Sequence, residues 1–410
     1  MHKILLVNFK NTFLIVLTCL FSLGSCQSQK NEQPKKTSLP EKNLNTSIIV
    51  GANQTGKYLP LLKDRNIGIV ANQTSVIFKN TGFTHLVDSL HALNIKIKRV
   101  FAPEHGFRGK ADAGEHIANG KDAKTGIDII SIYGKNKKPT NEQLKGLDII
   151  IFDIQDVGAR FYTYISSLHY IMEACAENNI PLLVLDRPNP NGHYIDGPVL
   201  EPKHKSFVGM HPIPVVHGMT IGEYAQMING EKWLNNNIKC ELHIISCKNY
   251  TKDKPYSLPI KPSPNLPNDA AINLYPSLCF FEGTSVSVGR GTEQQFQLFG
   301  APFLNKTDFT FTPQPNEGAK YPKHENKICY GYDLSQQQPL HKLNLNWLIQ
   351  AYNESANSDV TFWNNFFTKL AGTEQLQQQI TNGDSEKDIR ASWQEGLQKY
   401  NTMRSAYLLY

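Results

Sequence analysis

Four clusters of carboxylate, amide and basic residues in the first half of the sequence have side chains suited to catalysis. They occupy residues 72–74 (NQT), 103–108 (PEHGFR), 153–160 (DIQDVGAR) and 186–190 (DRPNP). A carboxylic acid can protonate the leaving oxygen of a glycosidic bond, and amides can hold sugar hydroxyl groups. Carboxylates with a histidine could instead hold a metal ion that activates water. The clusters therefore indicate hydrolysis, either of a glycoside or at a metal ion.

Glu104 is the first candidate for a general acid. Pro103 fixes the approach of the chain, and Gly106 lets the backbone turn closely around a ligand. A partly desolvated loop would raise the pKa of a glutamate towards the working pH. Asp156 and Asp153 could also act, although an aspartate just before a helix is often only an N-cap.

Selected polar side chains of these clusters, two tyrosines that follow the third cluster, and His217 further along the chain form the predicted ligand-binding set. The histidines could equally be satisfied hydrogen-bonding residues, and the tyrosines could belong to a helix core. The set comprises Asn72, His105, Arg108, Asp153, Gln155, Arg160, Tyr162, Tyr164, Arg187 and His217.

The second half of the sequence adds turn-rich segments that contain isolated polar side chains. Residues 262–267 (PSPNLP) include Asn265, which we add to the ligand-binding set. Glu282 and Arg290 each have a glycine neighbour and could be loop residues held for a ligand. The alternative is that both are solvent-exposed charged residues that happen to lie beside turn glycines. We count Glu282 among the catalytic candidates and Arg290 among the ligand-binding ones.

Short apolar runs alternate with amphipathic stretches between residues 47 and 247, which predicts strands separated by helices. Such a βα repeat favours a mainly parallel sheet covered on both faces, a Rossmann-like domain. The carboxyl ends of its strands would share one edge, where the four polar clusters fall. The predicted strands are 67–71, 97–101, 128–132, 147–152, 181–185 and 241–246, and the predicted helices include 86–93, 164–175 and 220–233.

Five prolines between residues 254 and 267 predict a domain boundary, because proline continues neither a helix nor a central strand. We predict a Rossmann-like catalytic domain over residues 47–260. Residues 261–410 would form a smaller α+β C-terminal domain that closes the cleft, with helices around 347–351 and 385–403.

Neither a GxGxxG nor a GxxxxGK[ST] segment occurs, so we expect no nucleotide cofactor. The formal charge of the whole chain is +6, but six lysines and two glutamates lie before residue 46, which leaves about +2 for the folded part. Nucleic acid is therefore not an expected partner. The cysteines after residue 26 contain no CxxC pair, which favours buried free thiols.

The first 25 residues have the features of an export signal. Two early lysines precede an apolar run over residues 13–23, which is shorter than a membrane span. The next residues (LGSC, 23–26) resemble a lipobox, so we expect cleavage before Cys26 and its acylation. Residues 26–46 would form a polar tether. The alternative is an ordinary cleaved signal with a chance cysteine. We expect an exported protein, periplasmic or membrane-anchored as a lipoprotein.

Taken together, the motifs resemble those of the exo-β-N-acetylmuramidases, a glycoside hydrolase family of peptidoglycan recycling formerly described as a domain of unknown function. The resemblance covers roughly residues 51–302. The residues that carry it are 68–74 (GIVANQT), 102–109 (APEHGFRG), 112–114 (DAG), 153–164 (DIQDVGARFYTY), 186–190 (DRPNP), 216–223 (VHGMTIGE), and 281–284 (FEGT) with 289–292 (GRGT).

The resemblance implies a Rossmann-like domain with a smaller C-terminal domain and an active site between them. It also implies release of terminal N-acetylmuramic acid from the nonreducing end of peptidoglycan fragments, without a cofactor. The proposed catalytic glutamate of the family corresponds to Glu104. Muramic acid carries a lactyl carboxylate, which Arg160, Arg187 or Arg290 could bind in a bidentate manner.

The resemblance leaves the second catalytic group open. Asp156 or Glu282 could activate water, the acetamide of the sugar could assist, or the lactyl ether could be eliminated. A metal-dependent hydrolase and a noncatalytic glycan-binding surface lipoprotein are the competing functional classes.

Overall fold

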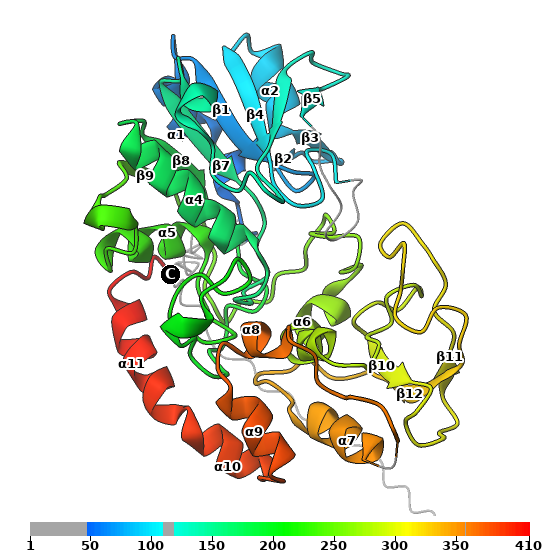
Figure 1. The fold of residues 1–410 in the computed structure, drawn as a ribbon. Coiled ribbons are helices and arrows are strands. Elements are labelled where there is room, and N and C mark those ends of the chain that lie inside the picture. The colour runs from blue at the N-terminus through cyan, green and yellow to red at the C-terminus, as the bar shows by residue number, and fades with distance from the viewer. Residues whose placement is uncertain (1–46, 110–118, 357) are drawn as a thin grey trace, which may run out of the picture. The chain divides into compact units, whose positions relative to one another are not determined.

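The computed structural model describes residues 47–109, 119–356 and 358–410 (Figure 1). Its main sheet has the strand order β5-β6-β4-β1-β7-β8-β9, parallel throughout except for the pairing of β5 with β6. The six predicted strands are confirmed with small changes at their ends. The bounds are β1 (Ile67–Ala71), β4 (Ile97–Ala102), β5 (Gly120–Lys121), β6 (Asp128–Ser131), β7 (Ile149–Asp153), β8 (Leu182–Leu185) and β9 (Leu242–Ile245).

Helices cover both faces of this sheet, because every central strand is apolar on both sides. Ile69 and Ile151 pack in one apolar cluster with α1 (Thr55–Leu62) and α2 (Leu86–Ala92). Val70 and Phe152 face the opposite way, into a second cluster with α4 (Tyr164–Glu177) and α5 (Ile221–Gly230). The predicted Rossmann-like arrangement is thus confirmed.

The predicted capping box at the start of α5 is present. Thr220 Oγ1 accepts a hydrogen bond from the Glu223 amide, and Glu223 Oε2 accepts one from the Thr220 amide. Smaller elements of this region were not predicted, because each is too short to show a period. They are η1 (Gly51–Asn53), the hairpin β2 (Val76–Phe78) and β3 (Phe83–His85), α3 (Asn141–Leu144), η2 (Pro202–His204) and η3 (Asn235–Asn237).

Residues 269–410 combine a small antiparallel sheet with helices, as Figure 1 shows. The sheet order is β10 (Leu298–Ala301), β12 (Cys329–Asp333), β11 (Thr310–Phe311). Phe299 and Ala301 of β10 belong to the same cluster as α4 and α5, so the core is continuous across the predicted boundary. The helices are α6 (Asp269–Leu278), η4 (Cys279–Gly283), α7 (Asn346–Ser355), α8 (Phe367–Ala371), α9 (Gln375–Thr381), α10 (Glu386–Ser392) and α11 (Gln394–Ser405).

The end of the chain returns to the parallel sheet. Tyr400 Oη donates to the His217 carbonyl at 2.7 Å, and Tyr410 Oη donates to Asp186 Oδ2 at 2.8 Å, just beyond β8. The described helices include none that is long and apolar enough to cross a membrane. The five cysteines of the described residues are buried free thiols, as predicted.

The buried Asp186 carboxyl should make stability depend on pH. Burial raises its pKa from 3.8 to about 6, although hydrogen bonds from Gly222, Thr220 and Tyr410 oppose the rise. The folded state therefore holds this proton more tightly than the unfolded state. The resulting stabilisation is full below about pH 4 and is lost as the pH rises through about 6, with a size of about 3 kcal/mol.

Denaturant unfolding at intervals from pH 4 to 7 measures this contribution. Asp186→Asn should flatten the decline of the free energy of unfolding between pH 4 and 7, whatever its effect on overall stability. Tyr410→Phe removes a bond to the ionised carboxyl, so the decline should extend to higher pH. An unchanged slope in both variants would assign the dependence to another group.

Candidate active site

The polar clusters meet at the carboxyl edge of the parallel sheet. β1 and β7 are neighbours, but the chain leaves β1 towards β4 and leaves β7 towards β8. This reversal of direction marks the position where ligands bind in open parallel sheets. Asn72 follows β1, Glu104 follows β4, and Gln155 follows β7. The fold therefore brings together residues more than 80 positions apart in the chain.

Glu104 is half-buried, and both of its carboxyl oxygens contact hydroxyl groups. Tyr133 Oη donates to Glu104 Oε1 at 2.7 Å, and Thr163 Oγ1 donates to Oε2 at 2.9 Å. Tyr133 follows β6, and Thr163 precedes α4. These two contacts fix the orientation of the carboxyl group, which is a requirement for proton transfer to a bound substrate.

Asn72 and Tyr164 form the buried support beneath Glu104. The Asn72 amide donates to Tyr164 Oη at 2.9 Å, and Tyr164 Oη lies 3.5 Å from the Glu104 carbonyl. Burial raises the pKa of Tyr164, and the charge of Glu104 adds to the rise, so the phenol stays neutral. The Asn72–Tyr164 pair thus holds the Glu104 loop against the start of α4.

Asp156 lies beneath the same region and contacts His217. Its Oδ2 accepts a hydrogen bond from the Gly158 amide at 2.7 Å and lies 3.4 Å from His217 Nε2. Asp156 Oδ1 is buried and has no hydrogen-bond partner within the described part of the chain. Gln155 instead donates to the Pro188 carbonyl and to the Asp156 carbonyl, which fixes the loop after β7.

Two of the three arginines predicted for the lactyl carboxylate are enclosed in the protein. The Arg160 guanidinium donates to the carbonyls of Pro198, Ile213, Leu370 and Ala371 and is fully buried. It joins the loop after β7 to the end of α8. A guanidinium held by four carbonyls in this way does not face a sugar.

Arg187 pairs with Asp153 in a second enclosed arrangement. Arg187 Nε and Nη2 donate to the two Asp153 oxygens at 2.7 and 3.0 Å, and both side chains are buried. Arg187 Nη2 also donates to the Val76 carbonyl. The contacts of this pair are structural, since they tie the ends of β7 and β8 to the β2–β3 hairpin.

Arg108 and His105 shape the loop that carries Glu104. Arg108 bonds to Asp88 at 3.0 Å and to Asp122 at 2.8 Å, and its guanidinium lies over the Phe107 ring. His105 is buried with a φ of 68°, in the left-handed region that side chains rarely adopt. This left-handed conformation turns the chain tightly directly after Glu104.

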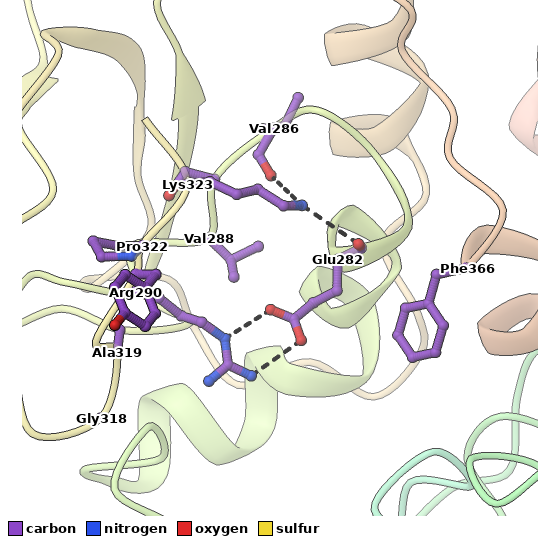
Figure 2. A pocket seen from close by; sticks show the side chains of 11 residues that line it. Glu282, Val286, Val288, Arg290, Gly318, Ala319, Pro322, Lys323 and Phe366 are labelled. Carbon is purple, nitrogen blue, oxygen red and sulfur yellow. Dashed lines mark hydrogen bonds and ion pairs between the residues drawn. The ribbon is translucent and has the colours of Figure 1, made fainter. Parts of the chain in front are cut away.

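Glu282 and Arg290 line a cavity of about 470 Å³ in the C-terminal part of the chain (Figure 2). Arg290 Nε and Nη2 donate to the two Glu282 oxygens at 2.7 and 3.0 Å, and the two side chains keep exposures of 23% and 24%. Burial alone would raise the pKa of Glu282, but Arg290 and Lys323 hold it below its usual value. This site therefore presents an ionised pair to the cavity.

Lys323 closes one side of the same cavity. Its ammonium donates to the carbonyls of Phe281 at 2.9 Å and Thr284 at 2.6 Å, and Figure 2 shows it reaching Val286 as well. It thereby caps the end of η4. The exposed rings of Tyr321 and Phe366 also line the cavity.

A ladder of buried aromatic rings runs from Arg290 of this cavity to the Glu104 loop. Its contacts are edge-to-face, with centroids 5.0 Å apart between Phe296 and Tyr275, 5.9 Å between Tyr275 and Tyr162, and 4.9 Å between Tyr162 and Tyr164. Arg290 lies over Phe296 at one end, and Tyr164 reaches Glu104 at the other.

The segment that holds Asn265 lies beside this ladder. Tyr162 Oη donates to the Pro262 carbonyl at 2.8 Å, which ties the segment to the loop after β7. Asn265 donates to the Gly318 carbonyl at 2.7 Å, and Gly318 is part of the cavity wall. Asn265 therefore supports the cavity wall through Gly318 and does not itself line the cavity.

Sequence reasoning missed Tyr133 and Thr163, which hold the Glu104 carboxyl. Tyr133 lies at the carboxyl end of a predicted strand, so the rule that found Glu104 applied to it as well. Thr163 lies between Tyr162 and Tyr164, which are both members of the predicted ligand-binding set. No signal in the sequence pointed to Lys323, whose partners lie about 40 residues away.

The predicted acylation site Cys26 and the motif at residues 112–114 lie outside the described residues. Across the described ranges, no three His, Cys, Asp or Glu side chains are grouped so that they could hold a metal ion.

Comparisons with known proteins agree with this architecture. Two crystal structures of DUF1343 family proteins from Bacteroides fragilis NCTC 9343 superpose with TM-scores of 0.81 and 0.73, at 45% and 27% identity. They cover 89% and 88% of this chain and 99% of their own chains.

Sequence comparison gives a consistent result over most of the chain. The peptidoglycan β-N-acetylmuramidase NamZ of Bacillus subtilis (strain 168) is 39% identical over 381 residues, which span 86% of this chain and 89% of that protein. The models of the N-terminal and C-terminal parts of exo-β-N-acetylmuramidase NamZ match residues 67–270 and 273–410. The chain belongs to the exo-β-N-acetylmuramidase NamZ family.

Proposed function

We propose that the protein is an exo-acting β-N-acetylmuramidase that releases terminal N-acetylmuramic acid from the nonreducing end of peptidoglycan fragments. The observation that carries this proposal is Glu104, fixed by Tyr133 and Thr163 at the carboxyl edge of the sheet in a chain of this family. Glu104 is the proton donor to the glycosidic oxygen, and the departing sugar leaves with that proton.

The second catalytic group is either a carboxylate or the acetamide of the sugar. Both candidate carboxylates already have partners, since Asp156 contacts Gly158 and His217 while Glu282 pairs with Arg290. Asp156 and Glu282 would therefore each act with those partners in place. Asp156 keeps one buried oxygen without a partner among the described residues. This supports a role for Asp156 in accepting a proton, or a hydrogen bond from a hydroxyl group.

We assign recognition of the lactyl carboxylate to Arg290. Of the three arginines considered, Arg160 and Arg187 are enclosed, whereas Arg290 lines a cavity and is linked to the Glu104 loop through the buried rings of the ladder. Glu282 accepts hydrogen bonds from Arg290 Nε and Nη2 and thereby orients the guanidinium. An oriented guanidinium in a partly enclosed cavity suits bidentate binding of a carboxylate.

Hydrolysis of a chromogenic β-N-acetylmuraminide tests the proposed activity, with and without a chelator. Release of the chromophore that resists the chelator supports the glycosidase. Release that the chelator abolishes would assign the reaction to a metal-dependent hydrolase. Binding without release would indicate a glycan carrier.

We further propose that the protein is exported and attached to a membrane through an acylated Cys26. The support is the sequence alone: an apolar run, a lipobox-like segment and a polar tether. A single acyl chain binds membranes only weakly, so stable attachment needs more than one chain. Fractionation of cells that make the wild type and Cys26→Ala should find only the wild type with membranes. Equal partition of the two would contradict the anchor.

A further inference from the structure

Three neighbouring aromatic side chains, one of which contacts Glu104, belong to neither apolar core of the protein. Tyr133, Tyr170 and Phe207 are half-buried and are absent from both clusters that stabilise the fold. The rings of Tyr170 and Phe207 stack at 6.3 Å with an angle of 20°, and Tyr133 lies 6.3 Å from Phe207. We call these three residues the aromatic patch. Partly exposed apolar rings that gather outside a core commonly mark a binding surface.

The aromatic patch is joined directly to the proton donor. Tyr133 contributes its ring to the patch and its hydroxyl to Glu104 Oε1. The other oxygen, Oε2, is held by Thr163, which lies between Tyr162 and Tyr164 of the ladder that leads to Arg290. The two oxygens of Glu104 are therefore held from two different elements, one by the aromatic patch and one at the start of α4.

A general acid in a glycosidase sits beside the oxygen that joins two sugars, so the surfaces on its two sides hold the two sugars. The proposed function places the terminal N-acetylmuramic acid at the Arg290 side. We propose that the aromatic patch binds the departing sugar, the N-acetylglucosamine next to the cleaved bond. This inference rests on the proposed function and adds a second subsite to it.

The physical character of the patch suits this occupant. The apolar face of a pyranose packs on an aromatic ring, and the partly exposed position lets the rest of a long chain leave over the surface. Phe207 is held in place by stacking on Tyr170 and by the Lys137 ammonium, 4.7 Å above its ring. A ring positioned before the substrate arrives costs little conformational entropy on binding.

Calorimetry on the full chain with Glu104→Gln tests the subsite without turnover. The probes are N-acetylmuramic acid, which fills only the terminal site, and the disaccharide N-acetylmuramyl-β-1,4-N-acetylglucosamine. Adding Phe207→Ala to this variant should weaken the affinity for the disaccharide about three- to tenfold and change the affinity for the monosaccharide less than twofold. Phe207→Tyr keeps the ring and should retain the disaccharide affinity.

Phe83→Ala is the matched control, because Phe83 is an exposed aromatic residue on β3 and contacts no residue of the patch in the described structure. It should change neither affinity. If Phe207→Ala weakens binding of both probes equally, or changes the affinity of neither, the subsite is overturned while the proposed function stays in place. Failure of the Glu104→Gln enzyme to bind either probe overturns the proposed function and the subsite with it.

Discussion

Glu104→Gln is expected to lower kcat on a muramyl disaccharide by about 10²-fold or more, the usual contribution of a general acid. The amide keeps the shape of the carboxyl and can still contact Tyr133 and Thr163, so substrate affinity should change little. The loss should be much smaller with a 4-nitrophenyl leaving group, which departs without protonation. Steady-state kinetics on both substrates measures the difference.

The dependence on the leaving group separates catalysis from damage to the fold. A structural defect would lower the rate on both substrates equally, which would reassign the proton donor. Glu142→Gln provides the matched control, since the Glu142 side chain lies on α3, is 83% exposed and is not among the residues seen to contact Glu104. That variant should retain the wild-type rate on both substrates.

Arg290→Met is expected to weaken binding of N-acetylmuramic acid about 10- to 100-fold, the range for a lost hydrogen-bonded contact to a charged group. N-Acetylglucosamine lacks the lactyl group, so its affinity should be nearly unchanged. The ratio of the two affinities is the decisive quantity, measured by calorimetry in the Glu104→Gln enzyme. Equal losses on the two sugars would remove Arg290 from lactyl recognition.

Stability must be followed in the same experiment, because Arg290→Met leaves the Glu282 carboxylate in the cavity wall without its main partner. Removing one member of a partly buried pair destabilises the remaining charge. Arg290→Lys keeps the positive charge but loses the fork that holds two carboxylates at once. It should preserve thermal stability better than Arg290→Met while still losing selectivity for the lactyl sugar.

Local patterns in the sequence predicted the parallel sheet and the edge that carries Glu104. The six strands were visible because their apolar runs are continuous and end in polar clusters. Helix α6 was not predicted, because Pro276 near its end is a poor helix residue and the proline-rich segment just before it suggested a loop. The helix predicted over 385–403 is two helices, α10 and α11, that meet at Trp393.

The sequence by itself determined the six parallel strands, the main helices between them, the capping box of α5 and the position of Glu104 at a strand end. Each depends on residues within a few positions of one another, whose periods and spacings are local properties. Only the tertiary structure decided which arginine faces a cavity. Arg160 is enclosed by the carbonyls of Leu370 and Ala371, more than 200 residues away. Burial is set by such distant partners, and no local spacing encodes it.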